Sequence, residues 1–416
     1  MEKYLTQNVF LPLGMRNANL ALGGDGQGAY ASGYVWEGNH FQLVPHQPQF
    51  AAAYGSLNAS ADDFTSALRA YLGDWQTDSG RFLSRDWLLR SETPHTYLAA
   101  KAGLTGTYAY GNEGYELEGR QFRGHRGAIG GFLSAFLYNR KDGVGYSFCI
   151  NTHNESFYRF ADARIRAFLT KTLSKVETKM TYPVSEAATK PFVGYYRLNN
   201  PGQLYTGFLE RLQNTFRLDT ADGGIRVGLL LGPVMQWQQT DSKRLLLKNA
   251  WMKWPHVALT FDEGGAPVVL DGGLFFEKIS VYEAWLSLIA LIASFLLLMS
   301  SVVFGLISSI LYFKRKWPLP LLILRLMPTL CTICFLLILS SGMQLLELMR
   351  TASPTENAFA IWNMGKWAYL LTGLSFIVLL AAKWKWLCSH VLKAYLSVLA
   401  LGILYFGVVF IVNNWY

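Results

Sequence analysis

The last third of the chain contains four apolar stretches, each long enough to cross a lipid bilayer as an α-helix. They cover residues 285–313, 319–346, 358–382 and 391–412. A helix needs about 20 mainly apolar residues to span the hydrocarbon core, and it satisfies its own backbone groups where lipid offers no partners. We therefore predict that residues 281–416 form a membrane domain of four transmembrane helices, whose partner is the lipid bilayer.

Basic residues beside these stretches predict the side of the membrane on which each loop lies. The loops after the first and third stretches carry Lys314, Arg315 and Lys316, and Lys383 and Lys385, respectively. Residues 350–357, after the second stretch, hold one arginine and one glutamate. Because Lys and Arg accumulate in cytoplasmic loops, we expect the first and third loops to be cytoplasmic. Residues 1–280 would then lie on the outer, periplasmic or extracellular, face.

The charge, cysteine and histidine patterns argue against several classes of function. The net charge is +9, from 37 Lys and Arg against 28 Asp and Glu, but the basic residues are dispersed and several flank the apolar stretches. We interpret this charge as a topology signal and predict no nucleic-acid partner. Three of the four cysteines lie in apolar segments. His40, His46, His95 and His153 do not have the spacing of metal ligands. We expect no disulfide framework, no metal site and no cofactor.

Residues 192–280, which follow a polar linker over residues 174–191, have the pattern of an antiparallel β-rich domain. Short runs of alternating apolar and polar residues are separated by Asp-Gly or Gly-Gly turns. This pattern predicts a meander or a small barrel. Trp237, Trp251 and Trp254 are candidates for a ligand-binding face. Tryptophan also fills barrel cores and lies at bilayer interfaces. We favour a place in the barrel core or at the bilayer interface over a ligand-binding face.

Residues 1–173 mix helix and strand signals and predict an α+β fold. Ser60 with Asp63 three residues later, and Ser84, each precede an amphipathic helix. From Gly103 onward we predict antiparallel strands with a turn at Asp142-Gly143, closed by a helix over residues 157–173. The glycine-rich residues 23–28 lack the Gly-Lys-Ser or Gly-Lys-Thr that follows in a phosphate-binding loop, so we expect a surface loop there.

Three stretches of this first part resemble the serine β-lactamase-related family, which includes class C β-lactamases, penicillin-binding carboxypeptidases and related esterases. Asn8-Val9-Phe10-Leu11-Pro12-Leu13-Gly14-Met15 is similar to the family's I-F-x-P-L-G-M stretch. Gly55-Ser56-Leu57-Asn58-Ala59-Ser60-Ala61-Asp62-Asp63 is similar to its G-G-L-x-S-T-A-x-D-L helix start. Gly124-His125-Arg126-Gly127, followed by Gly130-Gly131-Phe132, resembles its third active-site box, G-H-G-G-x-x-x-G-F. Residues 192–279 resemble the β-rich appendage of membrane-anchored members.

The resemblance implies a fold, a setting and a substrate class. Residues 1–173 would be the C-terminal portion of a β-lactamase/transpeptidase-like domain, held on the outer face of a bacterial cell or inner membrane. The family's activity is acyl transfer or hydrolysis on peptide, ester or β-lactam substrates, so a cell-wall peptide or an ester is the implied partner. In the family, the third-box strand lines one side of the cleft.

The same resemblance assigns roles to three residues of the third box. His125 would contribute its side chain, Ala128 a backbone N–H to the oxyanion, and Gly127 the room for substrate to lie against the strand. The alternative is that His125 is a strand histidine satisfied by its neighbours. We favour the inherited cleft.

The family's other two boxes, Ser-x-x-Lys with the nucleophile and Tyr-x-Asn with its proton-relaying phenol, precede the P-L-G-M stretch. No serine among the 416 residues has a lysine three positions later. Tyr110-Gly111-Asn112 has the right letters but follows P-L-G-M, and we do not expect it to fill the role.

Two hypotheses account for the missing boxes. In the first, the chain is the N-terminally truncated remainder of a serine hydrolase, inactive alone, and the DNA upstream of Met1 encodes both boxes. In the second, it is a complete, non-catalytic membrane protein that binds a peptide or lipid ligand at the residual cleft or the β-rich domain.

Overall fold

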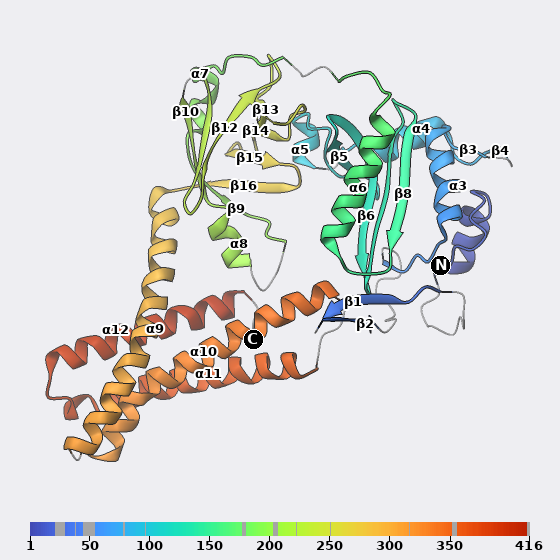
Figure 1. The fold of residues 1–416 in the computed structure, drawn as a ribbon. Helices are drawn as coiled ribbons and strands as arrows, with labels where there is room; N and C mark the ends of the chain where they lie inside the picture. The colour runs from blue at the N-terminus through green and yellow to red at the C-terminus, as the bar shows by residue number, and fades with distance from the viewer. Residues whose placement is uncertain are drawn as a thin grey trace.

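The computed structural model describes residues 1–416 except 21–29, 38, 45–54, 78–79, 96, 177–179, 203–206, 222, 250, 316, 352–355 and 414–416. The glycine-rich residues 23–28, His46 and Lys316 therefore lie outside the described residues. Three parts follow one another along the chain, namely an α+β domain, a barrel and a set of long helices (Figure 1).

The α+β domain is built on a four-stranded antiparallel sheet of order β5-β6-β7-β8. Helix α3 packs on β7 and β8 from one face, and α6 packs on the same two strands from the other face (Figure 1). The elements of this domain are α1 (Glu2–Leu5), η1 (Thr6–Phe10), β1 (Gly33–Glu37), β2 (His40–Val44), α3 (Ala61–Leu72), β3 (Gln76–Thr77), β4 (Gly80–Arg81), α4 (Arg85–Glu92), α5 (Leu98–Lys101), β5 (Glu113–Leu117), β6 (Arg120–Ile129), β7 (Phe132–Asn139), β8 (Val144–Ile150) and α6 (Glu155–Thr170).

The start of α3 joins two of the stretches that carry the family resemblance. Ser60 and Asp63 form the predicted capping box, in which the Asp63 N–H donates to Ser60 Oγ at 3.2 Å and the Ser60 N–H to Asp63 Oδ2 at 2.9 Å. The Asn17 N–H also donates to Asp63 Oδ1, at 3.1 Å. Burial alone would raise the pKa of Asp63, but these hydrogen bonds outweigh burial and lower it. Met15 packs against Ala67 of α3, which fixes the P-L-G-M stretch on the helix.

The second part is a closed barrel of eight antiparallel strands, in which β9 pairs with both β10 and β16. This confirms the predicted β-rich, barrel-like fold. Its elements are α7 (Glu186–Thr189), η2 (Lys190–Phe192), β9 (Gly194–Leu198), α8 (Gly207–Gln213), β10 (Phe216–Ala221), β11 (Gly224–Leu229), β12 (Val234–Gln239), β13 (Leu246–Asn249), β14 (Val257–Phe261), β15 (Pro267–Asp271) and β16 (Leu274–Ile279). Large side chains fill the interior, among them Tyr196, Phe216 and Trp237.

The three tryptophans of the barrel region have three different surroundings. Trp237 is buried in the barrel core, as predicted. Trp251 is exposed. Trp254 joins the barrel to the α+β domain, since its Nε1 donates to the Gly119 carbonyl at 3.0 Å and its backbone N–H to Glu116 Oε2 at 3.0 Å. Only Trp237 therefore serves the barrel core.

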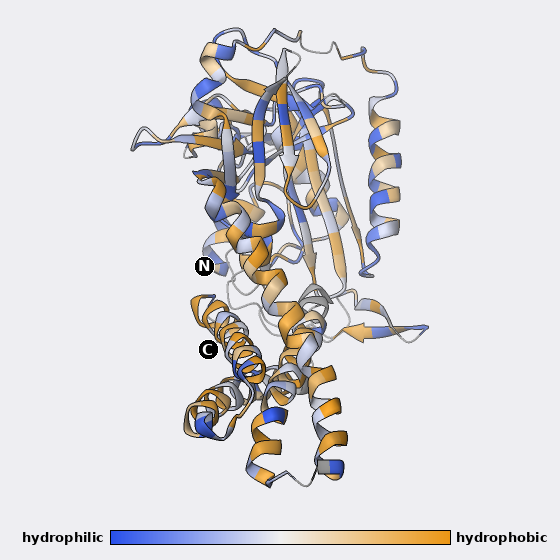
Figure 2. Cartoon of the chain, turned by 90° about the vertical axis from the view of Figure 1, so that its left-hand side faces the viewer, coloured by the Kyte–Doolittle hydropathy of each residue, from blue (hydrophilic) through white to orange (hydrophobic). Residues whose placement is uncertain are grey.

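The third part consists of α9 (Val281–Arg315), α10 (Leu319–Thr351), α11 (Glu356–Ala382) and α12 (His390–Val412), with the short η3 (Trp384–Trp386) before α12. All four α-helices are long and apolar enough to cross a membrane, which confirms the four predicted spans. In Figure 2 most residues of these helices have the colour of hydrophobic residues. The Ser301 and Thr332 hydroxyls lie 2.8 Å apart, and a Cβ at Gly305 would meet Thr329. Small residues thus bring α9 and α10 close together, as expected for helix packing in lipid.

Candidate third-box strand

The third-box residues lie in β6, and their side chains alternate between the two faces of the sheet. Arg126 faces α6, because its Nη2 donates to Asp162 Oδ2 at 2.9 Å. His125 faces the other side, since it is paired with Phe136, whose ring packs on Phe64 and Tyr71 of α3. Arg126, at the third position of the box, therefore points away from the face that His125 occupies.

The first residue of the box has a steric reason to be glycine. Gly124 has a φ of +140°, and a Cβ on it would lie 1.9 Å from the Phe136 carbonyl oxygen of the neighbouring strand. That atom belongs to the backbone and has no freedom to turn aside. The tight approach of β6 to β7 at this point therefore requires a residue without a side chain.

His125 is exposed, and its ring meets the edge of Tyr108 at a centroid distance of 6.0 Å. Its ring makes no hydrogen bond to another residue that the structure describes, and its role in a cleft stays a prediction. Burial raises the pKa of Tyr108, as do the nearby Glu113 and Tyr97, so this phenol keeps its proton at neutral pH. The imidazole is thus presented to solvent beside a protonated tyrosine.

One edge of β6 is open next to His125. Strand β5 pairs with β6 only from Arg120 to Gly124, whereas β7 pairs with it as far as Ile129. Residues 125–129 therefore have a strand on one side and, within the described part of the chain, none on the other. An extended peptide can add to such an edge as a further strand.

The turns at the two ends of β6 determine which backbone groups face this open edge. The two residues that flank a two-residue turn are hydrogen-bonded to each other through their backbone groups. The backbone N–H and carbonyl of Arg120 therefore point to β5, and those of Ile129 point to β7. Backbone groups alternate along a strand, so those of Arg126 and Ala128 point to the open edge. Within the described part of the chain, no neighbouring strand therefore pairs with the N–H of Ala128.

The side chains of Tyr110 and Asn112 have hydrogen-bond partners other than His125. The Tyr110 hydroxyl is 2.9 Å from His95 Nε2, and Asn112 is buried and donates to the Tyr138 hydroxyl at 2.7 Å. Both side chains thus have partners in the surrounding structure. Sequence reasoning missed Tyr108, the aromatic residue that does meet His125, because only Tyr110 has the spacing of a Tyr-x-Asn box.

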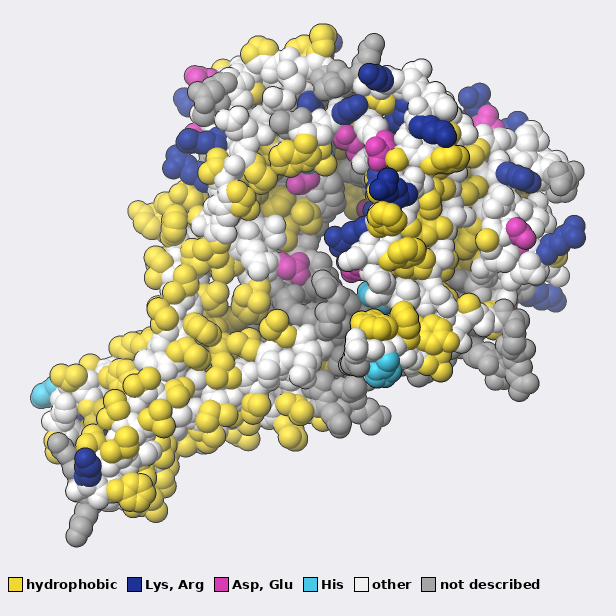
Figure 3. Space-filling model, in the orientation of Figure 1, with side chains coloured by type: hydrophobic (Ala, Val, Ile, Leu, Met, Phe, Trp, Pro, Cys, Tyr) yellow, Lys and Arg dark blue, Asp and Glu magenta, His cyan; other side chains and the backbone are white. Residues whose placement is uncertain are grey.

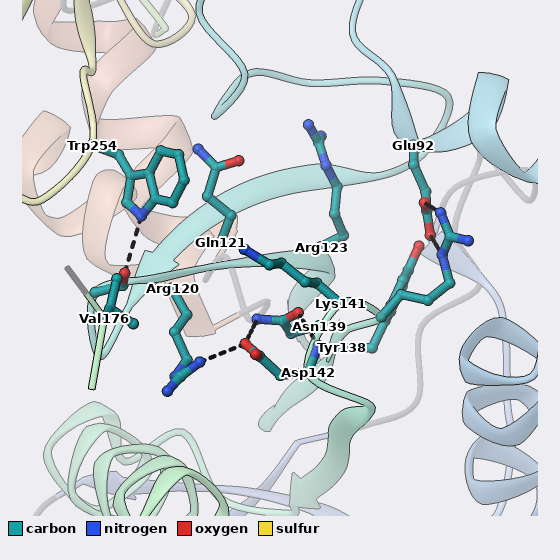
Figure 4. Close-up of a pocket in the computed structure, with 12 residues that line it drawn as sticks. Glu92, Arg120, Gln121, Arg123, Tyr138, Asn139, Lys141, Asp142, Val176 and Trp254 are labelled. Atoms are coloured by element: carbon teal, nitrogen blue, oxygen red, sulfur yellow. Dashed lines mark hydrogen bonds and ion pairs between the residues drawn. The ribbon is translucent and has the colours of Figure 1, made fainter. Parts of the chain in front are cut away.

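A cavity of about 300 Å³ lies at the opposite end of β6, between the sheet and the barrel (Figure 4). Arginines dominate its wall, but they already have partners. Arg120 Nη1 is 2.7 Å from Asp142 Oδ2, and Arg140 Nη2 is 2.6 Å from Glu92 Oε2. Arg123 donates to the Thr107 carbonyl at 2.9 Å. We interpret the cavity as part of the domain interface, because Arg120 and Arg123 of the sheet and Trp254 of the barrel region line it together and it does not include residues 125–129.

Comparisons with known proteins give the following matches. The family model described as Beta-lactamase matches residues 1–171. No curated protein matches the chain. The solved structure titled "Crystal structure of SurE" is 17% identical, with a TM-score of 0.38 over 67% of this chain and 62% of that one. "Crystal structure of SurE with D-Leu" is 18% identical, with a TM-score of 0.35 over the same shares. The chain thus spans 62% of the length of these two structures.

Proposed function

The N-terminal region of this chain belongs to the β-lactamase family, and from this premise we propose that the protein is a membrane-anchored homologue of the serine hydrolases that binds an acyl substrate along β6. The observation that carries the proposal is the open edge at residues 125–129. A peptide or ester lying there would meet the Ala128 N–H with its carbonyl oxygen. Gly127 would leave room for it, and the exposed His125 would contact it.

We further propose that these 416 residues do not form an acyl-enzyme by themselves. Family catalysis needs a serine nucleophile activated by a lysine three residues later, and the sequence holds no such pair. A hydrogen-bond donor at the oxyanion position stabilises a tetrahedral intermediate but does not create one. The edge of β6 would then bind substrate without cleaving it.

The first prediction is that the purified full-length chain shows no covalent labelling by a fluorescent penicillin or a fluorophosphonate. Labelling should equal that of a heat-denatured sample on a gel, with a class C β-lactamase as positive control. Rapid labelling that maps to one serine would overturn the proposed inactivity. The DNA upstream of Met1 separates our two hypotheses, because Ser-x-x-Lys and Tyr-x-Asn there support a hydrolase and unrelated sequence supports a binding protein.

The second prediction concerns the backbone donor. Ala128→Pro removes the N–H at an edge position, where proline is tolerated, and Ala128→Ser keeps it. We expect the proline variant to bind a D-alanyl-D-alanine peptide about 2- to 10-fold more weakly, as for the loss of one neutral hydrogen bond. The serine variant should bind as the parent chain does. Equal affinities of the proline and serine variants, measured by titration, would show that the N–H is not used.

A non-catalytic binding protein is the second candidate function, and the filled barrel favours β6 over the β-rich domain as its ligand site. Tyr196, Phe216 and Trp237 pack together inside the barrel, with Phe216 and Trp237 centroids 6.2 Å apart. A small barrel with such a core has no interior left for a lipid or peptide. The open edge of β6 then serves either candidate function.

We propose that residues 1–280 face the outside of the cell. The turns between α9 and α10 and between α11 and α12 lie at the end of the helices farthest from the barrel (Figure 1). Lys314 lies in the last turn of α9, and Lys383 and Lys385 lie between α11 and α12. An excess of basic residues marks the cytoplasmic side.

The third prediction uses two native cysteines, Cys149 in β8 and Cys388 in the turn before α12, which are both exposed. A membrane-impermeant maleimide added to intact cells should label Cys149 and leave Cys388 unlabelled. Although Cys149 is exposed, the protein atoms around its sulfur partly desolvate it and raise the pKa of its thiol, so its labelling should be slow and speed up at alkaline pH. Cys149→Ser and Cys388→Ser identify the labelled site. Labelling of Cys388 alone would invert the proposed topology.

A further inference from the structure

The hairpin of β1 and β2 exposes a face made of apolar and aromatic side chains. Its register pairs Tyr34 with Leu43 and Trp36 with Phe41, so these four residues share one face. Trp36, Phe41 and Leu43 are 55%, 59% and 61% exposed. Val35 and Val44, on the opposite face, are buried. A two-stranded ribbon in water normally turns its polar side outward, and this one does the reverse.

We define the aromatic face as Tyr34, Trp36, Phe41 and Leu43. Its three aromatic rings are packed against one another. Trp36 and Phe41 meet edge to face at a centroid distance of 4.8 Å. Tyr34 and Phe41 do the same at 6.5 Å. The aromatic face is thus a preformed apolar wedge.

The hairpin is also fixed to the sheet. The Tyr34 N–H donates to the Asn151 carbonyl at 2.9 Å, and the His153 N–H donates to the Tyr34 carbonyl at 2.9 Å. Gly33 lies so close to the turn between β6 and β7 that a Cβ on it would be 1.9 Å from the Gly130 carbonyl oxygen. The hairpin therefore moves with the sheet and with the end of β6.

The hairpin lies at the end of the α+β domain nearest the membrane helices (Figure 1; Figure 2). Helix α10 contacts β6, whose last residues adjoin the hairpin. In the space-filling view, hydrophobic side chains are exposed at this position and over the surface of the helices (Figure 3). The aromatic face is thus next to one end of the long apolar helices.

From this placement we propose that the β1–β2 hairpin inserts its aromatic face into the headgroup region of the bilayer crossed by α9–α12. Tryptophan and other aromatic residues are the side chains that collect at this depth, because they combine an apolar body with polar groups. Leu43 extends the same face toward the acyl chains. Burial in lipid would remove from water an apolar surface that has no protein cover. The hairpin would hold the open edge of β6 close to the membrane surface, and the proposal does not depend on catalysis at that edge.

The test measures the depth of position 43 in the membrane. The full-length chain with Cys149→Ser and Cys388→Ser keeps only the buried Cys331 and Cys334, so Leu43→Cys can be labelled selectively with an environment-sensitive nitrobenzoxadiazole dye. In phosphatidylcholine nanodiscs with spin-labelled lipids, we expect blue-shifted emission, quenching and a depth of about 5–10 Å below the headgroup boundary. Trp87→Cys on α4 is the matched control, because Trp87 is also 55% exposed and α4 lies far from α9–α12 (Figure 1). It should show neither effect.

Two results with the dye at position 43 of the otherwise unchanged hairpin would overturn the proposal. One is emission at position 43 like that of the Trp87 control, which would place the hairpin in water. The other is blue-shifted emission that spin-labelled lipids do not quench, which would mean that protein covers the aromatic face. Replacing Trp36 and Phe41 together with serine should reduce the quenching to the control level without changing the melting of the α+β domain, because both side chains are exposed. Unchanged quenching in that variant would also contradict the proposal.

Discussion

Gly124→Ala is expected to destabilise the α+β domain by about 3 kcal/mol or more, because two penalties add at this position. The φ of +140° lies in a region that residues with a Cβ rarely adopt. The new methyl group would also collide with the Phe136 carbonyl oxygen, which sits in the middle of the sheet. Relief would require β6 and β7 to separate, with loss of the hydrogen bonds between them.

Gly127→Ala is the matched control for this variant, since it adds the same methyl group three residues further along the same strand. The nearest atom there is Ser134 Oγ at 2.7 Å, which is the end of a side chain that can rotate. We expect little change from this control. Limited proteolysis with fragment mapping should show early loss of residues 1–173 in the Gly124 variant while the barrel and helices persist. Equal resistance of both variants would contradict the steric argument.

Features that depend on local sequence were predictable. Four long apolar runs identify membrane helices without knowledge of any tertiary contact, and the helices agree with the predicted spans. Ser60 and Asp63 form their capping box because its hydrogen bonds join residues three apart. The alternating runs after the linker form a barrel, because period-two patterns with tight turns favour neighbouring strands.

Features that depend on which strand lies beside which were not predictable. The sequence shows Arg126 next to His125, but only the register of β6 reveals that they face opposite sides. Tyr108 meets His125 because the chain before β5 folds back onto β6, and no spacing rule encodes that. The aromatic face of the hairpin was missed for a related reason. Tyr34-Val35-Trp36 is apolar at every position, so its pattern does not show which side is buried.

Asp162 is a further residue that sequence reasoning missed, and it links the third-box strand to α6. It is 3% exposed and accepts three hydrogen bonds from groups on different elements. Its Oδ2 lies 2.9 Å from Arg126 Nη2 and 3.1 Å from Arg166 Nε, and its Oδ1 accepts from the Tyr146 hydroxyl at 2.6 Å. Burial and the hydrogen bond to Asp162 raise the pKa of Tyr146, which keeps this donor protonated.

Asp162→Ala is therefore expected to cost about 3–5 kcal/mol, because it leaves Arg126, Arg166 and the Tyr146 hydroxyl with no carboxylate between them. Asp162→Asn retains an acceptor for Tyr146 but removes the charge, and it should cost about 1–3 kcal/mol. Arg159→Ala on the same helix is the control. Its ion pair with Glu155 is exposed, so the loss should stay below about 0.5 kcal/mol. Thermal melting can be followed by the proteolysis of residues 1–173. We expect stability to decrease in the order Arg159→Ala, Asp162→Asn, Asp162→Ala. If Asp162→Ala melted at the same temperature as Arg159→Ala, the buried carboxylate would not be what holds the third-box strand to α6.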